Sequence, residues 1–320
     1  MRILSGIQPS GKLHVGNYFG MMQPAIQMQD QAEIFLFIAD YHALTTTQDA
    51  KILKKLTNDA VLDFLACGID PKKTFFYKQS DVPEVHELAW LLSTVTPMGL
   101  LERCHSYKDK MSKGIPSSHA LFSYPVLMAS DILSINADII PVGKDQKQHV
   151  EVTRDLAERF NNLFGEVFVI PKPSIKESVS VVPGIDGQKM SKSYKNTIDI
   201  FDSGNSLKKR IMKIITDSKD LHEPKNPKSC NIFSIYKLFA NETEQKELAE
   251  LYYAGGMGYG HAKTILYETI ERYFAPMREK KLELKNNKDL VDDILSDGAK
   301  KASNISSDVL RRARLAVGLD

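Results

Sequence analysis

The chain has 320 residues, a formal net charge of +2 and 42% hydrophobic residues. This length and ordinary composition are typical of a folded protein with one or two domains, and they exclude a disordered chain. The near-neutral charge argues against a protein that coats nucleic acid, although it leaves room for local basic patches.

The cysteines and the apolar runs indicate the compartment. Cys67, Cys104 and Cys230 lie far apart and form no C-x-x-C pair, so we expect no thiolate metal site. Scattered cysteines also fit a reducing compartment. The apolar run after Met1 is too short for a signal peptide, and no stretch approaches the roughly 20 apolar residues that span a bilayer. We therefore expect a cytoplasmic protein without a membrane segment.

The first part of the chain alternates predicted strands with predicted helices. Strands are expected at Ile3–Leu4, Glu33–Asp40, Thr74–Tyr77 and Ile139–Val142, and helices at 17–31, 50–67, 83–92 and 149–160. The nearly continuous apolar run at 33–40 suits a strand that is covered on both faces of a parallel sheet. The alternation predicts an α/β fold with a Rossmann-like parallel sheet. Loops that follow the strands would then meet in one crevice.

The pattern changes after about residue 200. Strand signals end, and the chain from Asn205 onward is predicted to form helices joined by short polar loops. We therefore predict two domains, a Rossmann-like domain at 1–200 and an all-helical domain at 201–320. The final predicted helix, Ile305–Val317, could pack back on the first domain.

The first glycine-rich loop, Gly6–Leu13, differs from a P-loop. Leu13 stands where that pattern needs a magnesium-binding hydroxyl, and Pro9 removes a backbone N–H. The next residues, 14–17, lie where a helix should begin, and a helix N-terminus favours phosphate. His14 and Asn17 can donate hydrogen bonds there, and Gly16 lets a base approach the backbone. A capped turn with a surface histidine is the alternative.

The second loop, Lys189–Ser193, follows Gly184 and Gly187. Its two ammonium groups could move onto a leaving pyrophosphate and stabilise the charge that grows there in the transition state. The alternative for a loop rich in lysine and serine is a solvated surface segment.

The pair of motifs, His-x-Gly-x early and Lys-Met-Ser-Lys-Ser late, resembles the class I aminoacyl-tRNA synthetases. Further segments narrow the resemblance to the bacterial tryptophanyl-tRNA synthetases, and the similarity extends across nearly the whole chain. These segments are Ser5–Gly11, Gly16–Tyr18, Leu127–Leu133, Gly143–His149 and Leu156–Asn161. Tyrosyl enzymes share the architecture but do not usually share the Gln-Pro-Ser-Gly opening.

The resemblance implies an activity and its partners. L-Tryptophan and ATP would form tryptophanyl-adenylate and pyrophosphate with Mg²⁺, and the tryptophan would then pass to the 3′ end of tRNA(Trp). The domain at 1–200 would be catalytic, the domain at 201–320 would bind the anticodon, and the protein would be a homodimer. A tyrosine-specific relative and a catalytically silent RNA-binding descendant are the alternatives.

The resemblance also assigns site residues. Contacts to ATP would come from Gln8, Pro9, Ser10, His14, Gly16, Asn17, Gly143, Lys144, Asp145, Lys189, Met190, Ser191, Lys192 and Ser193. Contacts to tryptophan would come from Asp131, Tyr124, Met128, His42, Val142 and Gln146. The catalytic cations would be Lys110, Lys189 and Lys192, with a solvated helix charge as the alternative for Lys110. Two positions depart from the family: Lys144 replaces a common acidic residue, and His14 stands where threonine is frequent.

Asp131 has a physical rationale of its own. A carboxylate inside the apolar run Val126–Leu133 is costly to bury unless a donor satisfies it. An indole ring offers one N–H on a large apolar body, and a site built for that N–H would reject rings that lack it. A helix carboxylate paired with a lysine or a backbone group is the alternative, which the resemblance disfavours.

Two basic clusters in the C-terminal part could contact tRNA phosphates. They are Lys208, Lys209, Arg210 and Lys213, and then Arg311, Arg312 and Arg314. Solvated helix faces are the alternative for both clusters.

Overall fold

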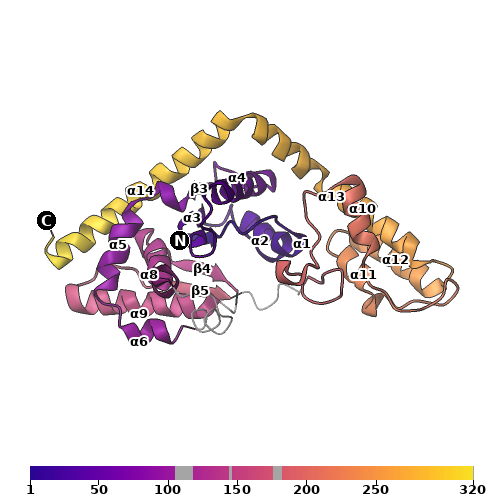
Figure 1. Cartoon of the computed structure of the whole chain (residues 1–320), viewed down its shortest axis with the longest axis horizontal. Coiled ribbons are helices and arrows are strands. Elements are labelled where there is room, and N and C mark those ends of the chain that lie inside the picture. The colour runs from indigo at the N-terminus through magenta and orange to yellow at the C-terminus, as the bar shows by residue number, and fades with distance from the viewer. Residues whose placement is uncertain (105–117, 144–145, 176–181, 320) are drawn as a thin grey trace.

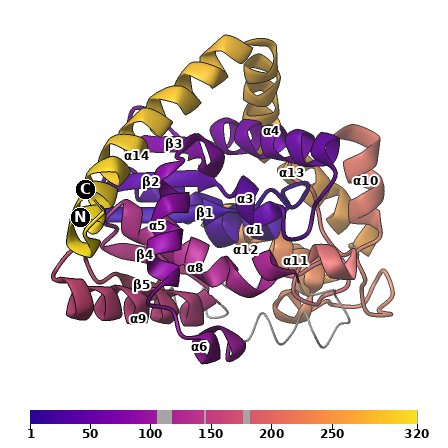
Figure 2. The ribbon, with the colours of Figure 1, turned by 60° about the vertical axis from the view of Figure 1, so that its left-hand side comes forward.

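A five-stranded parallel sheet lies at the centre of the computed structural model (Figures 1 and 2), which describes residues 1–104, 118–143, 146–175 and 182–319. Its strand order is β3-β2-β1-β4-β5. The strands are β1 (Arg2–Ile7), β2 (Glu33–Ile38), β3 (Thr74–Lys78), β4 (Ile139–Val142) and β5 (Lys172–Ile175). This topology confirms the predicted Rossmann-like α/β class.

The expected apolar strand is β2, and its alternate side chains enter two different cores. Leu36 and Ile38 pack in the same cluster as Phe64 of α4 (Ala50–Ala66). Phe35 and Phe37 pack on the opposite face with Ile132 of α8 (His119–Ser134). Because side chains alternate across a strand, apolar residues are needed at successive positions when both faces are covered.

Strand β5 did not follow from the sequence. It pairs with β4 from Ile139–Lys172 to Val142–Ile175, and it carries Pro173. Proline lacks an N–H for the ladder and is best tolerated in an edge strand, which is the position of β5. The segment Lys172–Ile175 is short and contains a lysine and a proline, so it lacks the apolar pattern by which strands are predicted.

The remaining helices surround the sheet or extend beyond it. They are α1 (Val15–Asn17), α2 (Gln23–Gln27), α3 (Asp40–Ala43), α5 (Glu84–Ser93), α6 (Met98–Glu102), α9 (Lys147–Phe164), α10 (Gly204–Met212), α11 (Asn231–Tyr236), α12 (Glu242–Ala254), α13 (Tyr259–Asn286) and α14 (Lys288–Val317). The helix predicted at 17–31 is broken by a π-helical turn, η1 (Tyr18–Met22). Pro24 lacks an amide hydrogen, which explains why regular helical bonding is interrupted there.

The last helix is longer than the sequence indicated, because α14 begins at Lys288 rather than at Ile305. It covers the edge strand β3, and a Cβ on Gly298 would lie 2.1 Å from the carbonyl oxygen of Phe76. Glycine is therefore required where helix and strand meet. Covering β3 with a helix also protects an edge that could pair with another chain. No helix of the described residues is long and apolar enough to cross a membrane.

Helix α13 lies between the helices α10, α11 and α12 and the final helix α14, which packs on the sheet. Figure 1 shows α13 and α14 meeting at an angle, with α10, α11 and α12 at one end of the molecule and α9 at the other. The ring of Tyr18 meets Phe274 of α13 edge to face, with centroids 5.2 Å apart. Lys281 of α13 forms an ion pair with the buried Asp63 of α4. These contacts fix the C-terminal helices against the first helices of the chain.

Candidate active site

The carboxyl ends of the strands bring the predicted site residues together. Gln8 follows β1, His42 follows β2 in α3, and Gly143 follows β4. The Gln8 side-chain amide lies 3.4 Å from the carbonyl oxygen of His42, which joins the first two strand ends. In a parallel sheet these ends share one edge, so they form one crevice.

His14 is the N-cap of α1 rather than an exposed histidine. It is buried, and its Nδ1 accepts a hydrogen bond of 3.3 Å from the backbone N–H of Asn17. The Asn17 side chain in turn accepts from the backbone N–H of His14, which completes a capping box. The capped-turn alternative therefore describes the local structure, although the histidine is not on the surface.

The second loop packs directly on the first. The Lys192 ammonium lies 3.2 Å from the carbonyl oxygen of Ser10 and 3.1 Å from that of Gly11. The backbone N–H of Gly16 donates to the Met190 sulfur at 3.3 Å, and Met190 is buried. A side chain on Gly16 would meet His14, so glycine permits this close approach. Two segments about 180 residues apart in sequence thus form one surface.

A buried asparagine supports the second loop. Asn196 accepts a hydrogen bond of 2.7 Å from the backbone N–H of Ser191 and donates to the carbonyl oxygen of Lys189 at 3.1 Å. Arg210 of α10 donates to the carbonyl oxygens of Lys195 and Thr197 at 2.5 and 2.6 Å. These bonds hold the loop backbone while the exposed side chains of Lys189 and Ser193 face solvent.

Charge and burial alter protonation in this part of the site. Burial lowers the pKa of His14 to about 4, and the nearby Lys192 ammonium acts in the same direction. The desolvation of Lys192 also lowers its own pKa, while Asp199 opposes that shift. Lys192 is nevertheless an exposed residue, so an arriving phosphate could reach it. A phosphate would replace carbonyl contacts with a stronger charge-assisted bond.

The Asp131 carboxylate lies at the other end of the crevice. Asp131 is only 5% exposed, and His42 Nε2 lies 2.9 Å from its Oδ2. Because a carboxylate accepts hydrogen bonds, Nε2 carries the hydrogen in this pair. Met128 and Val142 are partly buried in the adjoining apolar cluster. The predicted tryptophan residues Asp131, His42, Met128 and Val142 thus come from neighbouring elements of the fold.

A glutamine that no sequence motif marks, Gln79, also donates hydrogen bonds to the Asp131 carboxylate. Gln79 is 1% exposed, and its amide nitrogen lies 2.9 and 3.0 Å from the two oxygens of Asp131. Gln79 begins the 3₁₀ turn η2 (Gln79–Asp81), directly after β3. Its position behind a predicted strand was the one signal in the sequence that could have identified it.

Tyr124 takes part in a second pair on α8 and α9. Its hydroxyl lies 3.0 Å from Nε2 of the buried His149, and its ring meets the His42 ring edge to face. No motif or apolar pattern in the sequence singles out His149. Gln146 is the N-cap residue of α9, Gly143 directly follows β4, and both are exposed. Three predicted residues, Lys110, Lys144 and Asp145, lie outside the described residues.

The described residues do not form a protein cage for a metal ion. Among them, no group of three or more histidine, cysteine or acidic side chains could hold one. Magnesium commonly uses phosphate oxygens and water instead of such a cage.

The arrangement offers two sets of groups in one crevice. Basic and backbone groups of the two packed loops lie near the end of β1, where phosphates could bind. A buried acceptor in an apolar wall lies near the ends of β2 and β3, where a ring with an N–H could bind. These features define a class I tRNA synthetase. The chain belongs to the family of tRNA synthetases class I (W and Y), which it matches over residues 1–275.

Three similar proteins match this chain over nearly its full length. The tryptophan–tRNA ligase of Fusobacterium nucleatum is 54% identical, covering 99% of this chain and 98% of its own. A crystal structure of tryptophanyl-tRNA synthetase from Campylobacter jejuni, complexed with ADP and tryptophan, has 53% identity and a TM-score of 0.97, and both chains are fully covered. The tryptophanyl-tRNA synthetase structure from Mycoplasma pneumoniae has 30% identity and a TM-score of 0.81, covering 100% of this chain and 98% of its own.

The lowered pKa of His14 predicts a stability change with pH. At pH 7.5, well above the unfolded pKa of 6.5, the histidine is almost entirely neutral in both states, so its titration does not affect stability. As the pH falls from 6.5 towards about 4, the unfolded chain binds a proton that the folded chain does not, so stability falls. At pH 5 this loss is about 2 kcal/mol relative to pH 7.5.

Urea unfolding at pH 5 and pH 7.5 measures this effect. His14→Asn keeps an N-cap acceptor but cannot titrate, so its loss of stability at pH 5 should be smaller than that of the wild type by about 2 kcal/mol. Other groups titrate equally in both proteins and cancel in the comparison. An equal loss in the two proteins would contradict the burial of a neutral His14.

Proposed function

We infer that this chain activates L-tryptophan with ATP and transfers it to tRNA(Trp), as a ligase of translation. The observation that carries this conclusion is the buried Asp131 carboxylate in an apolar wall beside a phosphate-binding pair of loops. High identity to tryptophan–tRNA ligases over the full chain supports the same activity. A cytoplasmic location, where tRNA is charged, follows from this function.

Amino-acid selection rests on one acceptor. A carboxylate has about four lone-pair sites, and Asp131 uses three of them for Gln79 and His42. Oδ1 accepts only one of these bonds, so it can accept another from an indole N–H. A phenol ring carries its O–H at the tip of the ring, whereas the indole N–H lies on the side of its ring, so the two rings present their donors in different places. Tyrosine would therefore leave this acceptor less well satisfied, which costs binding.

The first chemical step needs positioning and charge stabilisation. The tryptophan carboxylate attacks the α-phosphate of ATP, and the bond to pyrophosphate breaks. Lys192, already against Ser10 and Gly11, would move onto the phosphates, and the exposed Lys189 would join it. Charge on the leaving pyrophosphate grows in the transition state, so these ammonium groups stabilise it there more than in the ground state.

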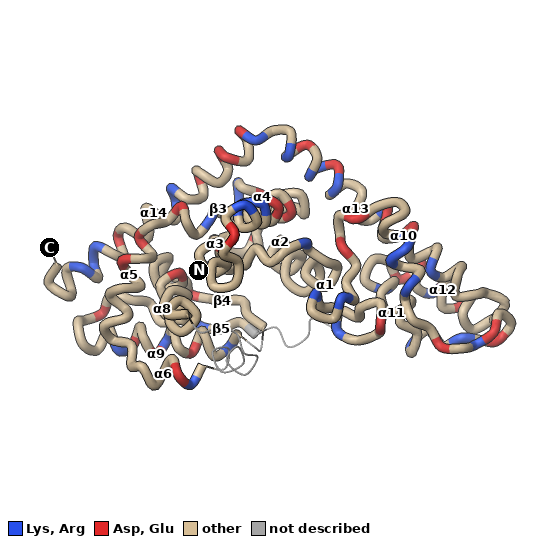
Figure 3. Tube along the Cα trace, viewed as in Figure 1, with Lys and Arg blue, Asp and Glu red and all other residues tan. Residues whose placement is uncertain are grey.

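The second step transfers the tryptophan to the terminal adenosine of tRNA. Basic residues of α10 are candidates for phosphate contacts, and Figure 3 shows where lysine and arginine occur along that helix. Lys209 and Lys213 line a hollow of about 270 Å³ together with Thr197. Arg311 and Arg312 instead pair with Asp308 on their own helix, which favours a structural role for them.

We also propose that two copies of the chain associate. Trp90 of α5 is 72% exposed, and Met98 of α6 is also exposed. Large aromatic side chains at the surface are enriched in protein interfaces, where they form energetic centres. A second copy that covers α5 and α6 would remove both side chains from water.

Pyrophosphate exchange tests the reaction and the role of Asp131. The wild type should exchange pyrophosphate into ATP with tryptophan and not with tyrosine, and EDTA should abolish the exchange because ATP requires magnesium. Asp131→Ala should lower kcat/KM for tryptophan by about 10- to 100-fold, since a hydrogen bond to a charged group is lost. The KM for ATP should change little.

Asp63→Ala is the matched control, because Asp63 is equally buried and paired but lies on α4. It should reduce stability without a selective effect on tryptophan. Exchange with tyrosine alone would indicate the tyrosine-specific relative, and no exchange with any amino acid would indicate a silent RNA-binding protein. Equal losses for tryptophan and ATP in Asp131→Ala would indicate a structural carboxylate.

Light scattering after size exclusion tests association. The wild type should have twice the mass of the chain, and Trp90→Glu should shift it towards the monomer because a buried charge is costly. Leu282→Glu, on a leucine of α13 that is 61% exposed, should remain dimeric. A monomeric wild type, or equal dissociation of both variants, would contradict the proposed face.

A further inference from the structure

The side chain of Gln79 connects three elements around the proposed amino-acid pocket. Its Oε1 accepts hydrogen bonds from the backbone N–H groups of Tyr41 and His42, at 3.2 and 3.4 Å. Its Nε2 donates to both oxygens of Asp131. The residue itself belongs to the turn after β3, so it joins that turn to α3 and to α8.

This pattern fixes which way the amide points. Backbone N–H groups can only donate, so the atom that faces Tyr41 and His42 must be the oxygen. The NH₂ group then has to face Asp131. The NH₂ group of Gln79 therefore holds the Asp131 carboxylate in one orientation. In that orientation Asp131 is ionised and offers only hydrogen-bond acceptors to a ligand. The orientation of Gln79 therefore determines what Asp131 can recognise.

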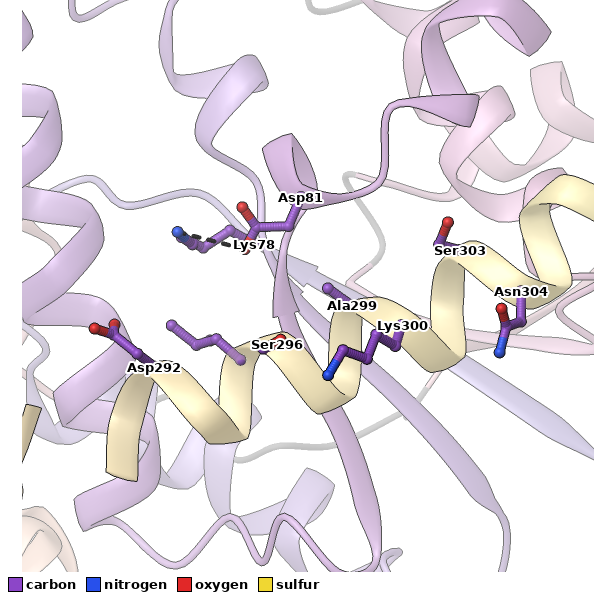
Figure 4. A pocket seen from close by; sticks show the side chains of 9 residues that line it. Lys78, Asp81, Asp292, Ser296, Ala299, Lys300, Ser303 and Asn304 are labelled. Carbon is purple, nitrogen blue, oxygen red and sulfur yellow. Dashed lines mark ion pairs between the residues drawn. The ribbon is translucent and has the colours of Figure 1, made fainter. Parts of the chain in front are cut away.

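The backbone of Gln79 is held equally firmly. Ser80 donates to Asp40 through its N–H at 3.0 Å and through its hydroxyl at 2.5 Å. Lys78 and Asp81 form an ion pair of 3.3 Å on the outer side of the same turn. Figure 4 shows this pair facing α14 across a polar hollow of about 560 Å³. Residues on both sides of Gln79, Lys78 before it and Ser80 and Asp81 after it, are thus held by side-chain contacts.

His42 is hydrogen-bonded to both Gln79 and Asp131. Its backbone N–H is bound by Gln79, while its ring binds the same carboxylate that Gln79 binds. Removing the Gln79 amide would leave two N–H groups of α3 without this acceptor. It would also leave the buried Asp131 with the His42 ring as its one remaining donor among the described residues.

We propose that Gln79 is a positioning residue for tryptophan specificity, which acts through Asp131 and rests on the proposed function. It holds the carboxylate so that a lone pair at Oδ1 points into the pocket for the indole N–H. Gln79 itself does not need to touch the amino acid. Its contribution appears as discrimination between rings with and without that N–H.

Gln79→Met and Gln79→Glu distinguish the contribution of the acceptor Oε1 from that of the donor Nε2. Methionine has a similar shape but neither hydrogen-bonding group. Glutamate keeps an acceptor for α3 but places a second carboxyl group against Asp131, and two buried carboxyl groups in contact cannot both remain ionised without a large cost. Both variants should raise the KM for tryptophan by about 10- to 100-fold. The KM for ATP should change by less than about threefold, because the bonds that are lost do not reach the phosphate-binding loops.

Gln29→Met is the matched control. Gln29 is also buried and also makes four hydrogen bonds, to Ile26, Gly68, Asp70 and Thr74, but it lies at the opposite end of β3. Thermal unfolding should show a comparable loss of stability for the two Gln→Met variants. The KM for tryptophan should be unchanged in Gln29→Met.

The decisive readout compares tryptophan with 3-benzothienylalanine, whose ring has sulfur in place of the N–H. The ratio of their kcat/KM values in pyrophosphate exchange should be large in the wild type and in Gln29→Met. It should fall at least tenfold in Gln79→Glu and in Gln79→Met, measured at a temperature where both are folded.

An unchanged ratio in either folded Gln79 variant would overturn the positioning role. Equal effects of Gln79→Met and Gln29→Met would also overturn it, since both would then be structural. Failure of the proposed function is distinguishable, because the wild type itself would then show no exchange with tryptophan.

Discussion

The buried carboxylate of Asp131 imposes the constraint around which this crevice is built. An acceptor that is 5% exposed in an apolar helix is stable only if donors reach it. The fold supplies them from two different strand ends, His42 after β2 and Gln79 after β3. Sheet register, the short helix α3 and the turn η2 therefore all contribute to the position of one carboxylate. Since burial makes the group costly, a substrate that satisfies its last lone pair is favoured over one that does not.

At the phosphate end of the crevice the contacting groups lie on loops rather than on a buried helix. The second loop is held by Asn196 and Arg210 while its lysines remain accessible. Lys192 already lies against the carbonyl oxygens of the first loop, so it has a short distance to travel to a phosphate in the same place. A rigid amino-acid pocket and a movable set of cations suit a reaction in which charge develops on the leaving pyrophosphate.

Some parts of this structure are readable from the sequence and others depend on distant contacts. The strand β2 was predictable because its unbroken apolar run needs two covered faces. Asp131 was noticeable because it interrupts such a run, and the two loops were recognisable by their motifs. Strand β5 was missed because Pro173 and Lys172 are tolerated at a sheet edge without any apolar pattern. Gln79 carries no motif, and its role follows from Asp131, which lies 52 positions away in sequence. The early start of α14 has a local cause, because the Asn287 side chain caps the helix by accepting a hydrogen bond from the backbone N–H of Leu290. The close packing of Gly298 on Phe76 depends instead on a distant contact that no local pattern indicates.

A crystal structure of this chain with tryptophan bound tests the central claim most directly. The account predicts that the indole nitrogen lies within about 3.2 Å of Asp131 Oδ1. The bonds from Gln79 and His42 to the same carboxylate should remain in place. An indole nitrogen that points to another group, or an Asp131 side chain turned out of the pocket, would contradict it.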